Sequence, residues 1–287
     1  MSICFFVSDL HGQIRRYEKL FAAIRQERPL ALFMGGDLLP SVFEYGFAKG
    51  AQETNFVDDY LLPEFRRLKK ILGSEYPHIF VILGNDDPRI FEASLRQGQA
   101  EKIWEYIHNR QASLNGLPVC GYACVPPTPF MLKDWERYDV SRFVDVGCIA
   151  PEQGYWTIPI PEAEILRRTI LDDLQILADA CDVAQAIFLF HAPPYQTNLD
   201  RAALDGRRID QVPVDVHVGS IAIKRFIEIY QPRLTLHGHI HEAPRLTQAW
   251  KEQIGRTVML SAAHDGPELA LVQFNLDAPG QAVRRLL

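Results

Sequence analysis

Two short runs in this sequence are apolar at every position, and they limit the fold more than any other feature. "CFFV" at 4–7 and "FVIL" at 80–83 lack the alternation of apolar and polar residues that marks a strand with one face in water. Such runs are typical of parallel strands whose two faces are both covered by helices. Amphipathic stretches separate them, so the order β-α-β-α-β and an α/β fold are predicted. The predicted elements are strands 2–8, 31–35 and 78–84 and helices 14–27 and 56–72.

The second half of the sequence is less regular. Prolines and glycines between residues 117 and 160 favour loops and short strands there. Pro63, inside the second predicted helix, indicates a kink or a break. No repeat or low-complexity linker divides the chain, so we expect a single domain over residues 1–287. The later predicted elements are helix 162–180, strand 186–190, helix 220–230, strand 233–237 and an antiparallel addition of strands 256–263, 269–276 and 282–287.

Charge and cysteine content exclude several classes of protein. The formal net charge is −6, so the chain has no general attraction for extended nucleic acid, and such a partner is not expected. No apolar run has the length of a membrane span, and the N-terminal run lacks the basic flank of a signal peptide. The five cysteines include no CxxC pair and are assigned no chemistry. We therefore expect a cytoplasmic protein without a membrane partner.

Five predicted strands are followed by the same kinds of polar residue. Within a few residues of each strand end the sequence has an aspartate, an asparagine or a histidine. The carboxyl ends of the strands line one crevice in an open α/β sheet, so we expect these side chains to converge. The residues are Asp9, His11, Asp37, Asn85, His191, His239 and His241.

These residue types at these positions indicate a metal centre. A single histidine at a strand end is usually a structural hydrogen-bonding group, and a single aspartate there is usually a helix N-cap. Seven oxygen and nitrogen donors without a sulfur donor are harder to explain in that way. Such donors suit Mn, Fe, Zn, Ni or Co, and seven exceed what one ion with an open position needs. Two divalent ions that share one carboxylate are therefore predicted, with Mn favoured.

The same residues resemble, in order, the five sequence blocks of the calcineurin-like metallophosphoesterases. The blocks are "DLH" from Asp9, "GGD" ending at Asp37, "GND" from Gly84, the strand-end His191 and "GHIH" from Gly238. The stretches around "HAPPY" and "HVGS" resemble most the bacterial Icc-related phosphoesterases. The resemblance implies a four-layer α/β/β/α sandwich of two mixed sheets flanked by helices, with a dinuclear centre at the sheet ends. It further implies that one ion is held by Asp9, His11 and His241 and the other by Asn85, His191 and His239, with Asp37 bridging.

The expected activity is hydrolysis of a phosphoester bond by a water or hydroxide that bridges the two ions. A phosphodiesterase is favoured over a phosphomonoesterase, and the expected substrate is a small phosphoester. Two alternatives stay open: a scaffold member of the superfamily with impaired catalysis, and a nuclease. The sequence does not indicate the oligomeric state.

One block departs from the family pattern at Asp86. The family usually has a histidine at this position, which is thought to protonate the leaving oxygen. An aspartate near two cations should have a lowered pKa and donate a proton poorly. Three interpretations stay open. Asp86 acts as a weak acid or as a base that orients water, or the leaving group departs without an acid. In the third, a neighbouring histidine such as His237 or His264 supplies the proton. Reduced dependence on a general acid is the favoured interpretation, and Asp87 is expected to be structural.

The remaining candidates are contacts to the substrate. Asn85 at the centre, and Arg201 and His217 in the loop after His191, are predicted to bind the substrate. Arginine suits this role because its guanidinium group grips phosphate through two hydrogen bonds. His237 is expected to be a buried, hydrogen-bonded histidine because it points away from the His239 and His241 pair.

Overall fold

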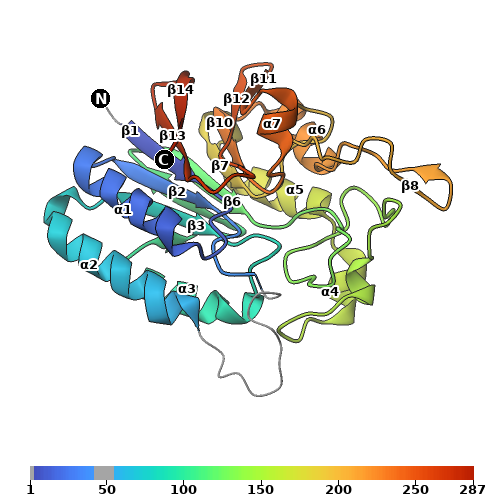
Figure 1. Cartoon of the computed structure of the whole chain (residues 1–287), viewed down its shortest axis with the longest axis horizontal. Helices are drawn as coiled ribbons and strands as arrows, with labels where there is room; N and C mark the ends of the chain where they lie inside the picture. Colours follow the sequence, from blue (N-terminus) through green and yellow to red (C-terminus); the bar gives the residue numbers. More distant parts are fainter. Residues whose placement is uncertain (1–2, 42–54) are drawn as a thin grey trace.

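Two six-stranded sheets lie at the centre of the molecule, and helices cover their outer faces (Figure 1). The computed structural model describes residues 3–41 and 55–287. Strand β2 of the first sheet contacts β7 of the second, and β3 contacts β6. The predicted α/β fold with four layers, two mixed sheets and flanking helices is confirmed.

The first sheet has four parallel strands and an antiparallel pair at one edge. Its order is β14-β13-β1-β2-β3-β4, with β13 antiparallel to both β1 and β14. The parallel strands come from the N-terminal part of the chain, as the apolar runs predict. The strands are β1 (Ile3–Val7), β2 (Ala31–Gly35), β3 (His78–Ile82), β4 (Glu105–Tyr106), β13 (Ala270–Asn275) and β14 (Ala278–Leu286).

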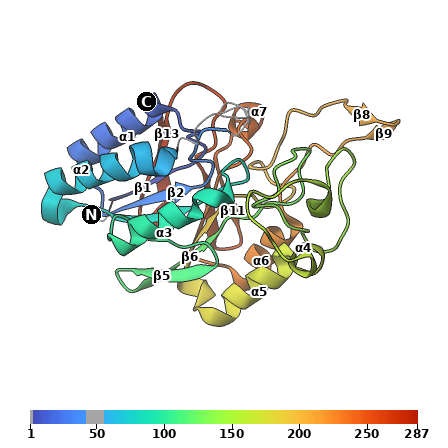
Figure 2. The same ribbon diagram turned by 90° about the horizontal axis from the view of Figure 1, so that it is seen from below.

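The second sheet also has four parallel strands, with an antiparallel strand at each edge. Its order is β11-β12-β10-β7-β6-β5. A separate hairpin of β8 (Arg208–Ile209) and β9 (Val212–Pro213) projects from the body of the molecule (Figure 2). The strands of the second sheet are β5 (Arg110–Leu114), β6 (Leu117–Tyr122), β7 (Ile187–Phe190), β10 (Leu234–His237), β11 (Lys251–Ile254) and β12 (Thr257–Ser261).

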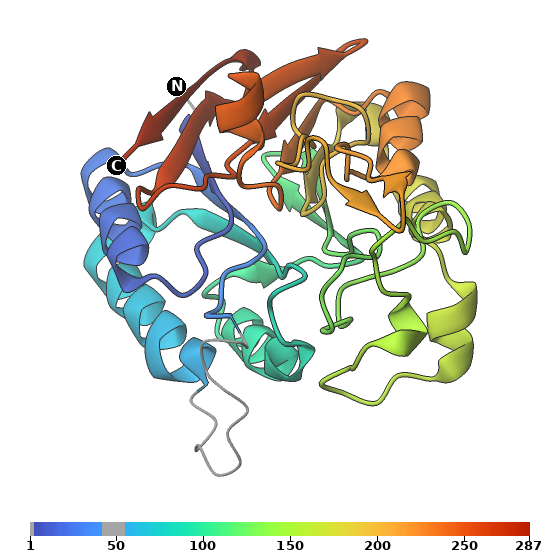
Figure 3. The ribbon, with the colours of Figure 1, turned by 45° about the vertical axis from the view of Figure 1, so that its right-hand side comes forward.

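The helices lie in two groups, one on the side of each sheet. In Figure 3 the blue and cyan helices of the N-terminal part lie on one side and the yellow and orange helices on the other. Within residues 3–41 and 55–287, no helix is long and apolar enough to cross a membrane. The α-helices are α1 (Ile14–Glu27), α2 (Leu62–Leu72), α3 (Glu92–Ala100), α4 (Glu162–Arg167), α5 (Ile170–Ala180), α6 (Ile221–Tyr230) and α7 (Ala243–Thr247). Short helices of other types are η1 (Val57–Leu61), η2 (Gly73–Glu75), η3 (Arg89–Phe91), η4 (Pro151–Gln153) and η5 (Val183–Gln185).

The core is built by strands that are buried on both faces. Phe5 and Phe6 are neighbours in β1 and point to opposite faces of the sheet, yet neither is exposed. Phe33 of β2 stacks on Phe80 of β3 with ring centroids 5.2 Å apart. Apolar residues of both sheets belong to one continuous buried cluster. This continuity supports the one-domain arrangement, which stays a prediction.

Three predicted elements differ from the structure or are refined by it. The predicted helix 162–180 is two helices, because Thr169 accepts a hydrogen bond from Asp172 N and starts α5 with a capping box. The antiparallel addition is correct for β13 and β14 but wrong for β12, which pairs in parallel with β10 of the second sheet. At the predicted kink or break, the helix type changes from the π-helix η1 to α2 at Leu62, next to Pro63, and the backbone stays helical across this junction. Ser2, in the first predicted strand, lies outside the described residues.

His237, at the end of β10, is a buried histidine with a partner for each ring nitrogen. Nδ1 lies 2.9 Å from the carbonyl oxygen of Ala192, and Nε2 lies 2.8 Å from Oγ1 of Thr235. Burial lowers the pKa of His237 to about 4, because a charged imidazole is poorly solvated in the core. The expectation of a buried, hydrogen-bonded histidine is confirmed, and His237 is not free to protonate a leaving group.

This buried histidine predicts a loss of stability in acid. Between pH 6.5 and 4 the unfolded chain binds a proton on His237 and the folded chain does not, so the free energy of unfolding falls as the pH falls. We expect a contribution on the order of 3 kcal/mol over this range. Urea unfolding of metal-free protein at several pH values would measure it. The His237→Gln variant should lose less stability in acid, and parallel pH curves for the two proteins would contradict the prediction.

Candidate metal centre

All seven predicted donor residues lie together where the parallel strands of the two sheets end. Asp9 and His11 follow β1, Asp37 follows β2, and Asn85 follows β3 in the first sheet. His191 follows β7, and His239 and His241 follow β10, in the second sheet. The site thus lies between the sheets, and neither sheet alone supplies the whole set. The parallel arrangement is the reason that residues at opposite ends of the sequence meet at one place.

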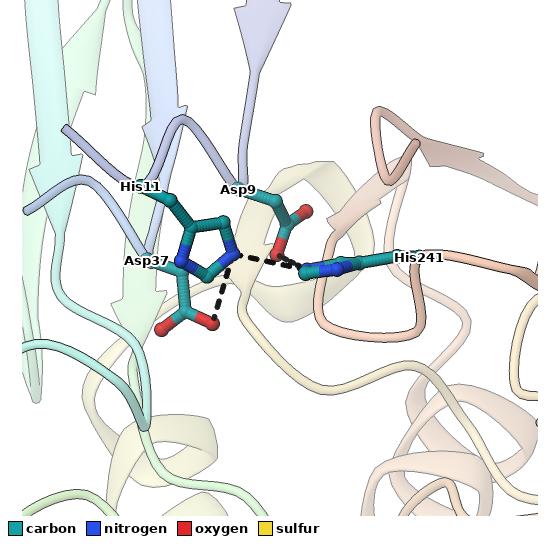
Figure 4. Close-up of side chains that lie close together, drawn as sticks. All are labelled: Asp9, His11, Asp37 and His241. Carbon is teal, nitrogen blue, oxygen red and sulfur yellow. Dashed lines mark hydrogen bonds and ion pairs between the residues drawn. The ribbon is translucent and has the colours of Figure 1, made fainter. Parts of the chain in front are cut away.

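One group of donors consists of Asp9, His11, Asp37 and His241. Their side chains point toward one another (Figure 4), and one donor atom from each lies within 4.8 Å of all the others. His241 Nε2 is 3.3 Å from Asp9 Oδ1, and His11 Nε2 is 3.1 Å from His241 Nε2. Carboxylate and imidazole groups that converge in this way have the donor chemistry of a divalent transition-metal site.

A second group shares Asp37 with the first. Asp37, His191 and His239 also offer donor atoms within 4.8 Å of one another. His191 Nε2 lies 3.3 Å from Asp37 Oδ2 and 3.1 Å from Asn85 Oδ1. Asp37 is therefore the one carboxylate that both groups contain, among the residues that the structure describes. This arrangement fits two ions with a shared oxygen ligand.

The backbone at four of these residues adopts a conformation that non-glycine residues seldom adopt. The φ angles of Asp9, His11, Asp37 and His239 are 58°, 46°, 51° and 74°. Such left-handed conformations have an energetic cost and persist only where the surrounding structure enforces them. For the loops after β1 and β2, Asp9 N and His11 N donate to the carbonyls of Gly36 and Asp37 at 2.9 and 2.8 Å, and His239 N donates to Asp9 Oδ1 at 2.9 Å. These contacts hold the backbone that carries the donor side chains.

Hydrogen bonds to the outer ring nitrogens fix the orientation of two imidazoles. His191 Nδ1 lies 2.8 Å from the carbonyl oxygen of Gly35, so this nitrogen donates and Nε2 is left to face Asp37. His11 Nδ1 lies 3.3 Å from Asp86 Oδ2, while its Nε2 faces the donor group. Metal-binding histidines commonly donate their second N–H to a carbonyl or a carboxylate, which sets the tautomer.

The electrostatic balance of the centre favours bound positive charge. Burial alone would raise the pKa of Asp9, but His241 beside it lowers the pKa to about 2. Burial would lower the pKa of His191, but the Asp37 carboxylate raises it to about 9. Burial and the neighbouring His191 lower the pKa of His239 to about 3. Protons on some imidazoles thus balance the buried carboxylates, and a metal ion would displace these protons on binding.

Asp87 has a structural position beneath the site. Its side chain is fully buried and accepts hydrogen bonds from Leu38 N at 3.1 Å, Leu39 N at 2.7 Å and Gly84 N at 2.9 Å. Burial raises the pKa of this carboxyl to about 7. Asp87 therefore ties the loop after β2 to the loop after β3, as expected for a structural residue.

Asp86 lies at the edge of the centre and faces His11. Its Oδ1 accepts a hydrogen bond from Ser41 Oγ at 3.0 Å, and its backbone N–H donates to Asp37 Oδ1 at 2.8 Å. The side chain also lines the cavity beside the centre. Asp86 thus contacts both the cavity and one of the candidate ligands.

The other predicted substrate contacts have partners away from the donor groups. Arg201 forms an ion pair with Asp205 at 2.5 Å, and His217 Nδ1 lies 2.8 Å from Asp200 Oδ1. Neither is among the described residues that line the cavity, although their neighbours Ala202 and Val218 are. Their role in substrate binding stays a prediction. His264, the other histidine considered as a proton donor, contacts Glu268 at 3.0 Å and is likewise absent from the described lining.

Several residues of the site carry no sequence signal that sets them apart. Ser8 Oγ donates to Asp9 Oδ2 at 2.5 Å, and Arg16 Nη1 donates to the carbonyl oxygen of Asp9 at 2.6 Å. Arg16 looks like an ordinary residue of the first turn of a helix, and only the adjacency of Ser8 to Asp9 hints at a shared site. The sequence also does not single out the individual residues of loops 126–132 and 202–218 that line the cavity.

One family of known proteins matches most of the chain. The sequence model of the calcineurin-like phosphoesterases matches residues 4–243. The chain belongs to the calcineurin-like phosphoesterase family. Members of this family are generally dimetal phosphoester hydrolases, and the two donor groups described above agree with that class. No curated protein matches the chain in sequence.

Solved structures share the fold of this calcineurin-like phosphoesterase at low sequence identity. One crystal structure has a TM-score of 0.61 at 15% identity and covers 99% of this chain and 98% of its own. The TT1561 protein of Thermus thermophilus has a TM-score of 0.55 at 16% identity, over 99% of this chain and 98% of that one. A dimetal phosphatase from Danio rerio has a TM-score of 0.50 at 11% identity, over 94% and 91%. Identities this low show a common fold and leave the substrate open.

The close packing at Gly84 predicts that a single methyl group would disturb the centre. A Cβ atom at Gly84 would lie 2.4 Å from Asp37 Oδ1 and 2.6 Å from His191 Nε2. We expect Gly84→Ala to bind at least one metal ion fewer per chain than the parent protein, by elemental analysis after dialysis. Gly280→Ala is the matched control, because its Cβ would meet only Val258, at 4.0 Å. Equal metal content in both variants would contradict the prediction.

Proposed function

We propose that this chain is a dinuclear metal-dependent phosphoesterase that hydrolyses small phosphodiesters in preference to phosphomonoesters. The observation that carries the proposal is the position of Asp37, whose carboxylate belongs to both donor groups. A buried carboxylate with histidines on two sides suits an oxygen ligand shared by two cations. The family match supports the class of reaction, and the diester preference is our own inference.

The proposed ligands divide between the two ions according to the two donor groups. Asp9, His11 and His241 would hold one ion, and Asn85, His191 and His239 the other, with Asp37 shared. Nitrogen and oxygen donors without a sulfur donor suit Mn, which we propose as the native metal. When bound, two such ions acidify a water, orient the phosphoryl group and neutralise the charge that develops during in-line displacement.

The protein's own contribution is to position these groups and the substrate. The hydrogen bond from His191 Nδ1 to Gly35 and the contact of His11 Nδ1 with Asp86 leave both Nε2 atoms facing the centre. Asn85 lines the cavity, so its amide is placed to contact the substrate as well as an ion. Arg201 and His217 would contact a substrate only if they exchange their present partners, Asp205 and Asp200.

For Asp86 we propose a positioning role in place of the family's proton donor. Its carboxylate faces His11 Nδ1 at 3.3 Å and thereby orients a candidate ligand. His237 has a partner for each ring nitrogen, and His264 contacts Glu268, so neither is placed to replace the missing donor. The proposed reaction therefore depends little on a general acid and suits leaving groups, such as aryl oxygens, that depart without one.

The two alternatives are less well supported. A scaffold without catalysis is disfavoured because the complete donor set converges. A nuclease is disfavoured because the described residues that line the cavity include no lysine or arginine to follow a phosphate backbone. We propose a cytoplasmic location, as expected from the sequence, and do not assign an oligomeric state.

Metal removal tests the proposal directly. The protein as isolated, or after loading with Mn, is expected to contain two metal ions per chain and to hydrolyse bis-p-nitrophenyl phosphate. Chelation should abolish turnover, and added Mn should restore it, because the nucleophilic water depends on the ions. Elemental analysis and the release of p-nitrophenol provide the two measurements. A chain that binds no metal and shows no turnover would support the scaffold alternative.

The role of Asp86 predicts different effects on turnover and on metal affinity. We expect Asp86→Ala to keep kcat for an aryl phosphodiester within about tenfold at saturating Mn, since the leaving group needs no acid. The Mn concentration for half-maximal activity should rise by about 10- to 100-fold, because His11 loses its orienting partner. Asp86→Asn keeps a hydrogen-bond acceptor and should lie between the two proteins. A collapse of kcat as large as that of Asp37→Ala would refute the positioning role.

A further inference from the structure

The cavity beside the metal centre has one polar side and one apolar wall. Its volume is about 380 Å³. The polar side is formed by the candidate ligands His11, Asp37, Asn85, His239 and His241. The main side chains of the apolar wall are Pro127, Phe130, Leu132, Leu204, Val218 and Ile240. All except Ile240, which lies between His239 and His241, come from loops that supply no candidate ligand. These residues, which we call the apolar wall, face the space that a substrate bound at the centre would fill.

Part of the apolar wall is an apolar cluster separate from the core. Ala202 and Ile240 are buried together with Ala243, and the partly buried Leu204 and Val218 pack against them. The other part includes Phe130, which is 52% exposed. Apolar side chains left partly uncovered beside a reactive centre gain stability when an apolar ligand group covers them.

Polar contacts hold both parts of the wall in place. Lys133 and Glu136 form a fully buried ion pair at 2.5 Å, and Thr128 N donates to Glu136 at 2.8 Å. Phe130 N donates to Thr128 Oγ1 at 3.1 Å, so the loop that carries Phe130 is fixed. On the other side, Ala203 N donates to Glu242 Oε1 at 2.9 Å, which holds the loop of Leu204. A wall fixed in this way provides a binding surface without further ordering.

The charged side chains that line the cavity disfavour a second negative charge on the substrate. Among the described residues that line the cavity, the charged side chains apart from histidine are Asp37, Asp86 and Glu242, all acidic. Asp37 belongs to the centre, whereas Glu242 lies close in the chain to the apolar wall residue Ile240. A second anionic group on the substrate would meet this carboxylate and no arginine or lysine of the described lining. Sugar hydroxyls against the wall would likewise lose hydrogen bonds to water.

We propose that the substrate is a phosphodiester that carries at least one uncharged, apolar ester group about the size of an aromatic ring, which packs against the apolar wall. The proposal rests on the proposed phosphoesterase function and adds the substrate class to it. The phosphoryl group lies at the metal centre, and the wall selects the group esterified to it. Glu242 discriminates against substrates with a second negative charge.

Binding of two simple phosphodiesters tests the proposal. Diphenyl phosphate and dimethyl phosphate have the same single charge and the same phosphoryl group and differ only in their apolar groups. By calorimetry with the Mn-loaded protein, we expect diphenyl phosphate to bind at least tenfold more tightly. Equal affinities, or no binding of either compound, would overturn the proposal.

Variants of the apolar wall test whether it causes the difference in affinity between the two phosphodiesters. Phe130→Ala and Leu204→Gln are each expected to weaken diphenyl phosphate binding about three- to tenfold and to leave dimethyl phosphate binding within about twofold. Ile229→Ala is the matched control, since Ile229 is a 71% exposed side chain on α6 and does not line the cavity. An unchanged preference in both wall variants would overturn the proposal.

A further variant tests the role of charge. Glu242→Gln keeps an oxygen that accepts the Ala203 N–H and removes the negative charge. We expect it to bind 4-carboxyphenyl phenyl phosphate at least threefold more tightly than the parent protein, with diphenyl phosphate unchanged. An unchanged affinity for the carboxylated compound would refute the role of Glu242.

Turnover of bis-p-nitrophenyl phosphate separates this inference from the function it rests on. If the protein turns over this compound but does not prefer diphenyl phosphate to dimethyl phosphate, the substrate class proposed here is wrong and the phosphoesterase function stands. If the protein prefers diphenyl phosphate but hydrolyses no ester, the apolar wall binds apolar groups as proposed and the phosphoesterase function is wrong.

Discussion

The carboxylate of Asp37 is the point at which the two halves of this fold depend on one another. It belongs to the first sheet, yet it lies 3.3 Å from His191 of the second, and its other oxygen accepts the Asp86 N–H. Burial alone would raise the pKa of Asp37, but His191 lowers it well below the usual range, so the group stays charged in the interior. A buried charge is stable only with such partners. Charged side chains therefore join the two sheets where their strands end, and apolar side chains join them elsewhere. The candidate metal centre lies among the charged side chains.

The sequence was most informative where one physical constraint acts alone. Doubly apolar runs such as Cys4–Val7 can be buried only between other layers, which was enough to predict parallel strands. The donor residues could be predicted because a parallel sheet gathers its strand ends, whatever the loops do. Elements governed by pairing across the sheet were harder. Strand β12 looks like one of a series of antiparallel tail strands, yet it joins the second sheet in parallel with β10. It is antiparallel only to β11, and a pairing with a strand about twenty residues earlier is not written in the local sequence.

The site likewise contains residues that the sequence predicts and residues that it does not. Its donor residues follow strands and could be found, whereas its apolar wall comes from loops whose course depends on particular side-chain contacts. Leu204 is placed through the hydrogen bond from Ala203 to Glu242, a residue far along the chain. Phe130 is placed through the contacts of Thr128 and Glu136. Nothing in the local pattern around these residues distinguishes them from ordinary surface loops. Arg201 and His217 show the reverse case, because their types suggest phosphate contacts while the structure gives them carboxylate partners.

The buried pair of Lys133 and Glu136 has a consequence for how this protein could diverge. Removing one partner would leave an uncompensated charge in the interior, at a cost of about 3 to 5 kcal/mol. The loop that lines the cavity is thus tied to the stability of the whole chain and is less free to vary than most surface loops. A descendant that acquires a different substrate would more readily change the tips of this loop, such as Phe130, than its course. Substrate selectivity in such a lineage would change in small steps while the backbone of the loop stays the same. A large change would require Lys133 and Glu136 to be replaced together.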